Sequence, residues 1–469
     1  MEGARRLSPS RKEVHVATLA TATVFLALAL PAPLLAQATS SNVPPARDPR
    51  IHAIAGAPQA DRIERDIRTL VGFGTRSTLS DTLSDTRGIG AARRWIKAEF
   101  DRISAACGGC LEVSYQRMLV KGDPQSRIRE DTWVVNVVAI QRGKTMPDRY
   151  VIMTGDIDSR VSDVMDATSE SPGANDNASG MAGVLEAARV LTQYEFDKSI
   201  VYAGLSGEEQ GLFGGQHMAD VAVQQGWKID AVLNNDMIGN IHGINGVIDN
   251  TSFRVFSEPT PVTETERERQ RRRFTGGEVD GPSRQLARYV ARIADEYFTN
   301  LDAMMVYRLD RFGRGGHHRP FNDRGFPGVR IMETNENYNR QHQDLRTENG
   351  VEYGDVIEWV DFDYAAKLTG VNAAVLASLA WAPAPPQNVR ISGAVRPSTT
   401  LQWEASPAPN VAGYKVYWRL TTEPQWTHWV WAGNVTEHTL ENVVIDNYLF
   451  GVAAVAPDGN ESVVVFPGS

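Results

Sequence analysis

The sequence predicts an α/β fold with a mixed, mostly parallel sheet sandwiched between helices, followed by an all-β sandwich. Between residues 59 and 381, short apolar runs alternate with stretches that have helical apolar spacing. Continuous apolar strands separated by helices are typical of a parallel sheet buried on both faces. The Pro-rich segment 382–386 then breaks the pattern, and short alternating segments with turn signals fill residues 385–469. Two domains therefore follow each other.

The elements of the first domain follow from their periodicity. Apolar residues at helical spacing predict six helices, at residues 60–71, 87–106, 178–196, 212–227, 283–298 and 364–381. β-branched or apolar runs predict the strands, at residues 133–140, 150–154, 199–204, 231–233 and 329–332.

The first residues have the pattern of a signal peptide. A basic start is followed by an apolar run at residues 17–35 and by the small-x-small sequence Ala36-Gln37-Ala38. This pattern predicts cleavage after Ala38 and a secreted or periplasmic protein. Residues 39–58, rich in Pro, Ala and Ser, are expected to form a linker. No later run reaches the roughly 20 apolar residues of a membrane span.

Charge and cysteine content exclude several classes of protein. A formal net charge of −9 argues against nucleic acid as a partner. With only two cysteines, any metal must be held by carboxylates and imidazoles. Cys107 and Cys110 form a C-x-x-C, which is either a redox motif or a small structural disulfide. Export and the position after a helix favour the disulfide.

Acidic residues gather where the predicted strands end. Asp156 and Asp158 follow strand 150–154, and Asp236 follows strand 231–233. Glu208-Glu209 follows another strand, and Asp176 opens a helix. Each alone could be an ordinary turn or helix-cap residue. However, the carboxyl ends of parallel strands meet at one edge, where clustered carboxylates need cations. The pattern therefore predicts a divalent-metal site.

The order of these motifs resembles the zinc aminopeptidase family of the bacterial leucyl aminopeptidase type, which also includes glutamate carboxypeptidase II and glutaminyl cyclases. The resemblance covers about residues 60–380. It rests on Asn175-Asp176-x-x-Ser179-Gly180, Glu208-Glu209-Gln210-Gly211-Leu212, Asp236-Met237-Ile238-Gly239, Gly316-His317-His318-Arg319-Pro320-Phe321 and the late His342.

The resemblance implies a metal-dependent aminopeptidase acting on peptides, with two divalent ions, zinc above all. Asp176 would bridge the ions, and Glu209 and His342 would complete one site. Asp156 and Asp236 would complete the other. Glu208 would be the general base, with Asp158 orienting its neighbours.

Two departures from the family pattern bear on this site. The first ligand of the family is usually His, whereas this chain has Asp156. We therefore expect the second site to accept manganese or magnesium, or to stay empty. Several relatives carry Tyr before the last His, whereas this chain has Gln341. His318 and Tyr338 are weak candidates for stabilising the oxyanion, and His317 has no assigned role.

Three further interpretations remain open. The same fold could be a carboxypeptidase or a glutaminyl cyclase, and a non-catalytic binding protein is the hypothesis from another class. The charged segment 264–273 is either a solvated helix or part of a lid whose arginines meet acidic groups on substrates.

In the C-terminal domain, the spacing of Trp403, Tyr414, Tyr417 and Tyr448 resembles a fibronectin type III domain. Such a domain offers a surface for contact with a polymer or a cell surface.

Overall fold

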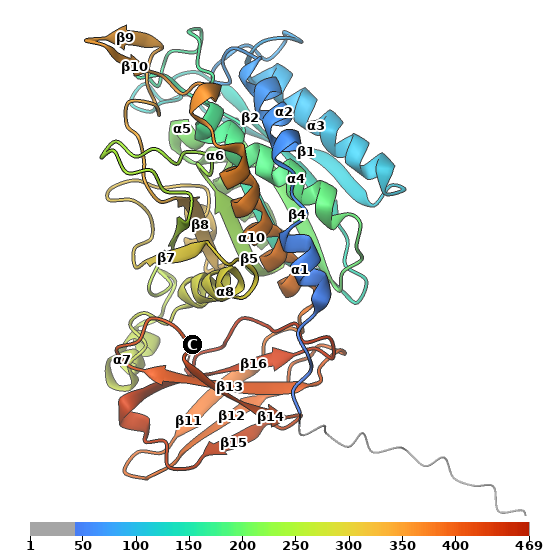
Figure 1. Cartoon of the computed structure of the whole chain (residues 1–469), viewed down its shortest axis with the longest axis vertical. Helices are drawn as coiled ribbons and strands as arrows, with labels where there is room; N and C mark the ends of the chain where they lie inside the picture. The colour runs from blue at the N-terminus through green and yellow to red at the C-terminus, as the bar shows by residue number, and fades with distance from the viewer. Residues whose placement is uncertain (1–42, 469) are drawn as a thin grey trace, which may run out of the picture. The chain divides into compact units, whose positions relative to one another are not determined.

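A computed structural model describes residues 43–468, so the predicted signal peptide lies outside the described residues. The larger domain contains one eight-stranded mixed sheet in the order β1-β2-β4-β3-β5-β8-β6-β7 (Figure 1). Its centre, β4-β3-β5-β8, is parallel, while β1, β2 and β6 pair with antiparallel neighbours. The strands are β1 (Leu111–Val120), β2 (Thr132–Gln141), β3 (Met146–Asp156), β4 (Lys198–Leu205), β5 (Lys228–Asn235), β6 (Ser252–Phe256), β7 (Asp302–Val306) and β8 (Gly328–Glu333). The hairpin of β9 (Arg346–Glu348) and β10 (Val351–Tyr353) lies outside this sheet.

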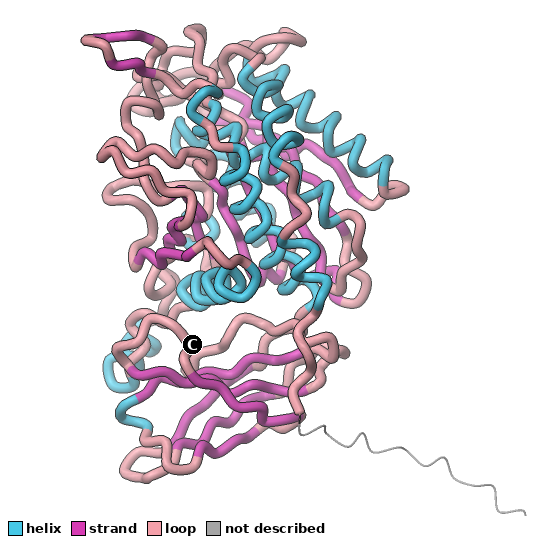
Figure 2. Tube along the Cα trace, in the orientation of Figure 1, coloured by secondary structure: helices cyan, strands magenta, loops and turns pink. Residues whose placement is uncertain are grey.

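Helices cover both faces of the sheet, because alternate residues of each strand point to opposite faces. Val151 and Met153 of β3 belong to a core shared with α2, α3, α4 and α10. Figure 2 shows the helices of this domain in cyan beside the magenta strands. Ile152 belongs to a second core, which includes residues of α6 and α9. The helices are α1 (Pro49–Ala55), α2 (Ala60–Val71), α3 (Gly88–Ala106), the π-helix η1 (Ala174–Ser179), α4 (Gly180–Leu191), α5 (Glu208–Gly211), α6 (Phe213–Gln224), α7 (Glu266–Thr275), α8 (Pro282–Tyr297), α9 (Arg319–Asn322), the 3-10 helix η2 (Ile357–Trp359) and α10 (Phe362–Trp381).

Part of the segment expected as a linker is ordered as helix α1. Asp48 caps it by accepting a hydrogen bond from the backbone N–H of Arg50. Ile51 and Ile54 lie on one side of the helix and are fully buried in the core shared with α10. Two isoleucines three residues apart therefore anchor this segment, although its composition is that of a linker.

The C-terminal part is all-β, as expected. It contains two three-stranded antiparallel sheets, in the orders β11-β12-β15 and β14-β13-β16. Their shared core includes Trp403 and Tyr414, whose ring centroids are 5.3 Å apart. Its elements are β11 (Gln387–Ser392), β12 (Thr399–Glu404), β13 (Gly413–Leu420), β14 (His428–Gly433), β15 (Glu437–Leu440), the 3-10 helix η3 (Ile445–Asn447) and β16 (Tyr448–Val455). The specific likeness to fibronectin type III stays a prediction.

A buried carboxylate joins this β domain to the α/β domain. Asp280, just before α8, faces Arg288 at 3.0 Å and Arg419 of β13 at 2.7 Å. All three side chains are at most 1% exposed. One negative charge thus serves two guanidiniums from two domains, in surroundings where each charge needs its partner.

Two smaller expectations concern the cysteines and the membrane. Cys107 and Cys110 form a disulfide directly after α3, which closes a loop with a sequence separation of 3. Within residues 43–468, none of the helices combines the length and apolar character needed to cross a bilayer.

Candidate metal centre

The predicted acidic residues lie at the carboxyl ends of the central parallel strands. Asp156 is the last residue of β3, and Asp236 directly follows β5. Glu208 and Glu209 open the short helix α5 after β4, and Asp176 lies in η1 before α4. Strand order therefore brings residues 80 positions apart in sequence to one edge of the sheet, as parallel topology requires.

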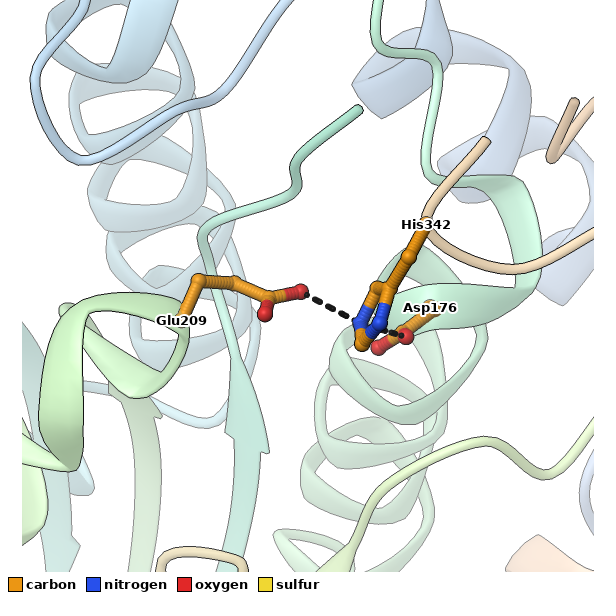
Figure 3. Close-up of side chains that lie close together, drawn as sticks. All are labelled: Asp176, Glu209 and His342. Carbon is orange, nitrogen blue, oxygen red and sulfur yellow. Dashed lines mark ion pairs between the residues drawn. The ribbon is translucent and has the colours of Figure 1, made fainter. Parts of the chain in front are cut away.

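Three side chains converge closely enough to hold one metal ion. His342 Nε2 lies 2.9 Å from Asp176 Oδ2 and 3.0 Å from Glu209 Oε1. Figure 3 shows the imidazole between the two carboxylates. Among residues 43–468, Asp176, Glu209 and His342 form the one group of at least three such residues whose ligand atoms all lie within 4.8 Å of one another. This group is one of the two sites that the sequence predicted.

The carboxylates and the imidazole of this group favour one another's charged forms. Burial disfavours the imidazolium of His342, but the carboxylates of Glu209 and Asp176 outweigh it and raise its pKa to about 10. Burial likewise opposes ionisation of Asp176, yet His342 and two nearby arginines hold its pKa well below the usual range. A cation between the carboxylates is what this arrangement favours.

Neighbouring side chains fix the position of each ligand. The backbone N–H of Asp176 donates to Asp355 Oδ2 over 2.7 Å. Asp158 accepts from the backbone N–H groups of Glu208 and Glu209, at 3.3 and 3.1 Å. Asp158 therefore holds the start of α5. Arg160 lies 2.7 Å from His342 Nδ1 and 2.9 Å from Glu209 Oε2.

Asp156 is engaged by protein hydrogen bonds on both carboxylate oxygens. Its Oδ1 lies 2.5 Å from Nδ1 of His317, and its Oδ2 accepts from Asn177 Nδ2 over 2.6 Å. Burial is the main cause that raises the pKa of Asp156, and burial lowers the pKa of His317 to about 4. Both groups are thereby driven toward their neutral forms. Nε2 of His317 is buried and has no hydrogen-bond partner among the described residues.

Asp236 is paired with a protein cation. Its Oδ1 lies 2.9 Å from Nη2 of Arg330, whose guanidinium also donates to the backbone carbonyl of Asp236 over 3.0 Å. Arg330 is fully buried and reaches Asp310 at 3.2 Å on its other side. A guanidinium thus stands beside the carboxylate that was predicted to bind the second ion.

Glu208 faces the same space as the three converging ligands. They line a cavity of about 900 Å³ together with Asp236 and Tyr338. Burial is the largest cause that raises the pKa of Glu208 well above its usual value, followed by the charge of Glu209. A carboxyl group whose proton affinity is raised in this way suits a group that accepts and returns a proton.

The two weak oxyanion candidates differ in position. Tyr338 lines the cavity and is 54% exposed, with its hydroxyl donating to Glu336 over 3.3 Å. His318 is fully buried, is not part of the cavity wall, and has its Nε2 2.8 Å from the carbonyl of Leu309. His318 is therefore a structural side chain. None of the described residues of the charged segment 264–273 lines this cavity either.

Sequence reasoning missed four residues that shape the site, namely Arg160, His317, Arg330 and Asp355. A signal for His317 was present. The family usually has His at the position of Asp156, and His317 is a histidine of this chain to which the resemblance assigns no role. The structure brings Asp156 and His317 into contact.

Comparison with known proteins identifies the family to which this chain belongs. A model of Peptidase family M28 matches residues 136–361. A probable zinc metalloprotease of Leptosphaeria maculans is 44% identical over 426 residues, which cover 91% of this chain and 98% of that protein. One from Pyricularia oryzae is 40% identical over 455 residues, covering 92% and 89%. The crystal structure of the LapA aminopeptidase of Legionella pneumophila has the same fold, with a TM-score of 0.51, 19% identity and coverage of 71% of this chain and 72% of that one. The chain therefore belongs to Peptidase family M28.

Proposed function

We propose that this protein is an exported, zinc-dependent aminopeptidase that removes residues from the N-termini of peptides. The observation that carries the proposal is the convergence of Asp176, Glu209 and His342 beside Glu208 in one cavity. The names of the relatives, probable zinc metalloproteases, and of the aminopeptidase with the same fold agree with it.

The three converging side chains fit zinc. Two carboxylates and one imidazole are a donor set that zinc accepts, and three protein ligands leave a position open for catalysis. Zinc bound there would polarise the scissile carbonyl and lower the pKa of water. Manganese and magnesium prefer sites richer in oxygen ligands, so the imidazole of His342 favours zinc.

Glu208 is proposed as the general base and Asp158 as the residue that positions it. Glu208 would take a proton from the attacking water and deliver it to the leaving amine. Asp158 holds the backbone N–H groups of both Glu208 and Glu209. The base and a zinc ligand therefore keep a fixed spacing during proton transfer.

We further propose that the chain binds a single zinc ion, which is the empty-site alternative for Asp156 and Asp236. Arg330 already supplies a buried positive charge beside Asp236. Both carboxylate oxygens of Asp156 already form hydrogen bonds, one with His317 and one with Asn177. A second divalent ion would have to displace these contacts. It would also lie close to the fully buried guanidinium of Arg330, and the repulsion between the two positive charges disfavours its binding.

The other functions of this fold receive less support. A single zinc keeps the glutaminyl cyclase alternative open, but the names of the relatives, probable zinc metalloproteases, favour hydrolysis of peptides. A carboxypeptidase would use the same centre with the opposite polarity of substrate. A non-catalytic binding protein would have no need of Glu208 and its positioning by Asp158. Export and a polymer or surface contact of the C-terminal domain stay part of the proposal.

The test is cleavage of a panel of peptides by the zinc-loaded protein. We expect release of single N-terminal residues, inhibition by a chelator and recovery with one equivalent of zinc. Glu208→Gln keeps the size of the side chain but removes its basicity, and we expect it to retain zinc and to lose nearly all turnover. Full activity of this variant, or release of C-terminal residues only, would overturn the proposal.

A further inference from the structure

The wall of the cavity is unusually rich in arginine. Arg127 comes from the loop between β1 and β2, and Arg160 follows β3. Four more belong to the segment between β7 and β8, namely Arg311, Arg314, Arg319 and Arg324. The β1–β2 loop, the segment after β3 and the long β7–β8 connection thus contribute arginines to the wall of one cavity, together with the proposed zinc ligands.

Some of these arginines already have carboxylate partners. Arg324 lies 2.6 Å from Asp220, and Arg160 lies 2.9 Å from Glu209. Arg127 donates to the backbone carbonyl of Glu209 over 2.7 Å. These contacts hold the wall together and leave those guanidiniums little capacity for a ligand.

Arg314 is far less satisfied. It approaches Glu336 only at 3.5 Å, and that carboxylate already accepts from Arg311 at 2.9 Å and lies 3.7 Å from Arg254. Three guanidiniums therefore share Glu336, although Arg311 also pairs with Asp310 and Arg314 has the charge of Asp176 nearby. The side chain of Arg314 is one-third exposed, so it can turn toward a ligand in the cavity.

Arg319 is in a similar position on the neighbouring turn. Its contact with Asp323 is a loose one of 3.8 Å, and both side chains are about half exposed. An exposed pair of this kind contributes little to stability. A guanidinium held so weakly is available for a second, better-placed carboxylate.

The same wall offers little to an apolar side chain. Leu212 and Pro320 are its only aliphatic side-chain surfaces among the described residues, apart from the stems of the charged side chains. Binding of a leucine side chain gains free energy when its apolar surface moves from water into an apolar environment, which this wall does not provide. A guanidinium, in contrast, binds a carboxylate through two parallel N–H groups, and such charge-assisted pairs are stronger than neutral hydrogen bonds.

We infer that the enzyme selects peptides that carry a carboxylate close to the scissile bond, held by Arg314 and Arg319. The inference rests on the proposed peptidase function and names its substrate class. The carboxylate has two sources, an Asp or Glu side chain or the free C-terminus of a short peptide. The arginines of segment 264–273 have no part in it, because none of them lines the cavity.

The experiment uses pairs of peptides that differ in one charge and are offered to the zinc-loaded protein. One pair has Glu or Gln at the N-terminus, a second has Glu or Gln at the next position, and a third is a dipeptide with a free or amidated C-terminus. We expect the charged member of at least one pair to have a kcat/KM roughly tenfold higher, mostly through a lower KM. The pair with the largest ratio identifies the source of the carboxylate.

Variants connect the selectivity to the two residues. Arg314→Gln and Arg319→Gln should each reduce the charged-to-neutral ratio, and the double variant should bring it close to one. Arg308→Gln is the matched control, since Arg308 is exposed, lies in the same segment between β7 and β8 and does not line the cavity. It should leave the ratio unchanged.

A binding measurement keeps this inference separate from the proposed function. Calorimetry with Glu208→Gln compares the same peptide pairs without turnover, so a chain that cleaves nothing still reveals its preference. Tighter binding of charged peptides, lost in the double variant, supports the inference even then. Ratios near one in both assays would overturn it while leaving the peptidase proposal intact.

Discussion

Replacing Asp156 by Asn separates a one-zinc centre from a two-metal centre. The amide can keep both contacts, because its oxygen can accept from Asn177 and its NH₂ can donate to Nδ1 of His317. His317 then places its proton on Nε2, which has no partner in the described structure. Because two hydrogen bonds are preserved and a neutral group replaces a carboxyl, we expect a loss of at most about 1 kcal/mol in unfolding free energy.

The metal content is the decisive measurement for this variant. Native mass spectrometry and elemental analysis of protein titrated with zinc should give one equivalent for both the wild type and Asp156→Asn. Asp176→Asn is the control, since it removes an anionic ligand of the converging group and should abolish tight binding. Two tightly held equivalents in the wild type and one in Asp156→Asn would refute the single-zinc assignment and the role given to Arg330.

Three further predictions concern stability. Burial raises the pKa of Glu258 to about 7, so stability is lost as the pH rises from the unfolded-state value near 4.5 through 7; Glu258→Gln should therefore raise Tm at pH 8 and change it little at pH 4, and an equal shift at both would contradict the assignment. Asp280→Asn leaves Arg288 and Arg419 without their shared charge and should cost about 3–5 kcal/mol in chemical denaturation; a loss below 1 kcal/mol would show that these charges are compensated elsewhere. Cys107→Ser opens a very short loop and should cost about 2 kcal/mol at most, so failure to fold would indicate another role for the disulfide.

Periodicity was sufficient for most of the α/β domain. The expected helix at residues 60–71 coincides with α2, and the apolar runs lie within β2, β3, β4, β5 and β8. The predicted runs in these elements are mostly apolar and buried, so their local pattern and their tertiary environment agree. β6 and β7 have five residues each and partly exposed positions, and so short a segment gives little periodicity to detect.

The candidate site likewise contains residues that could be predicted from the sequence and residues that could not. Glu208, Glu209 and Asp176 could be predicted because each belongs to a local motif, the first two after a strand and Asp176 at the start of a helix. Arg330 could not, since its role arises from pairing with Asp236, 94 positions earlier in the chain, across adjacent parallel strands. A buried arginine in an apolar strand is ambiguous until the carboxylate beside it is known.

The shared carboxylate between the two domains has a consequence for how this protein can be shortened or its domains exchanged. A chain shortened after Trp381 would keep Asp280 and Arg288 but would lose Arg419. It would also lose Glu461, whose backbone carbonyl accepts a hydrogen bond from the hydroxyl of Tyr289 of α8 over 3.0 Å. The C-terminal domain is therefore built into the enzyme as part of its framework, unlike a module tethered by a flexible segment. Any surface that it presents to a polymer must lie away from the face that contacts α8, and exchange of this domain between relatives requires both sides of the contact to change together.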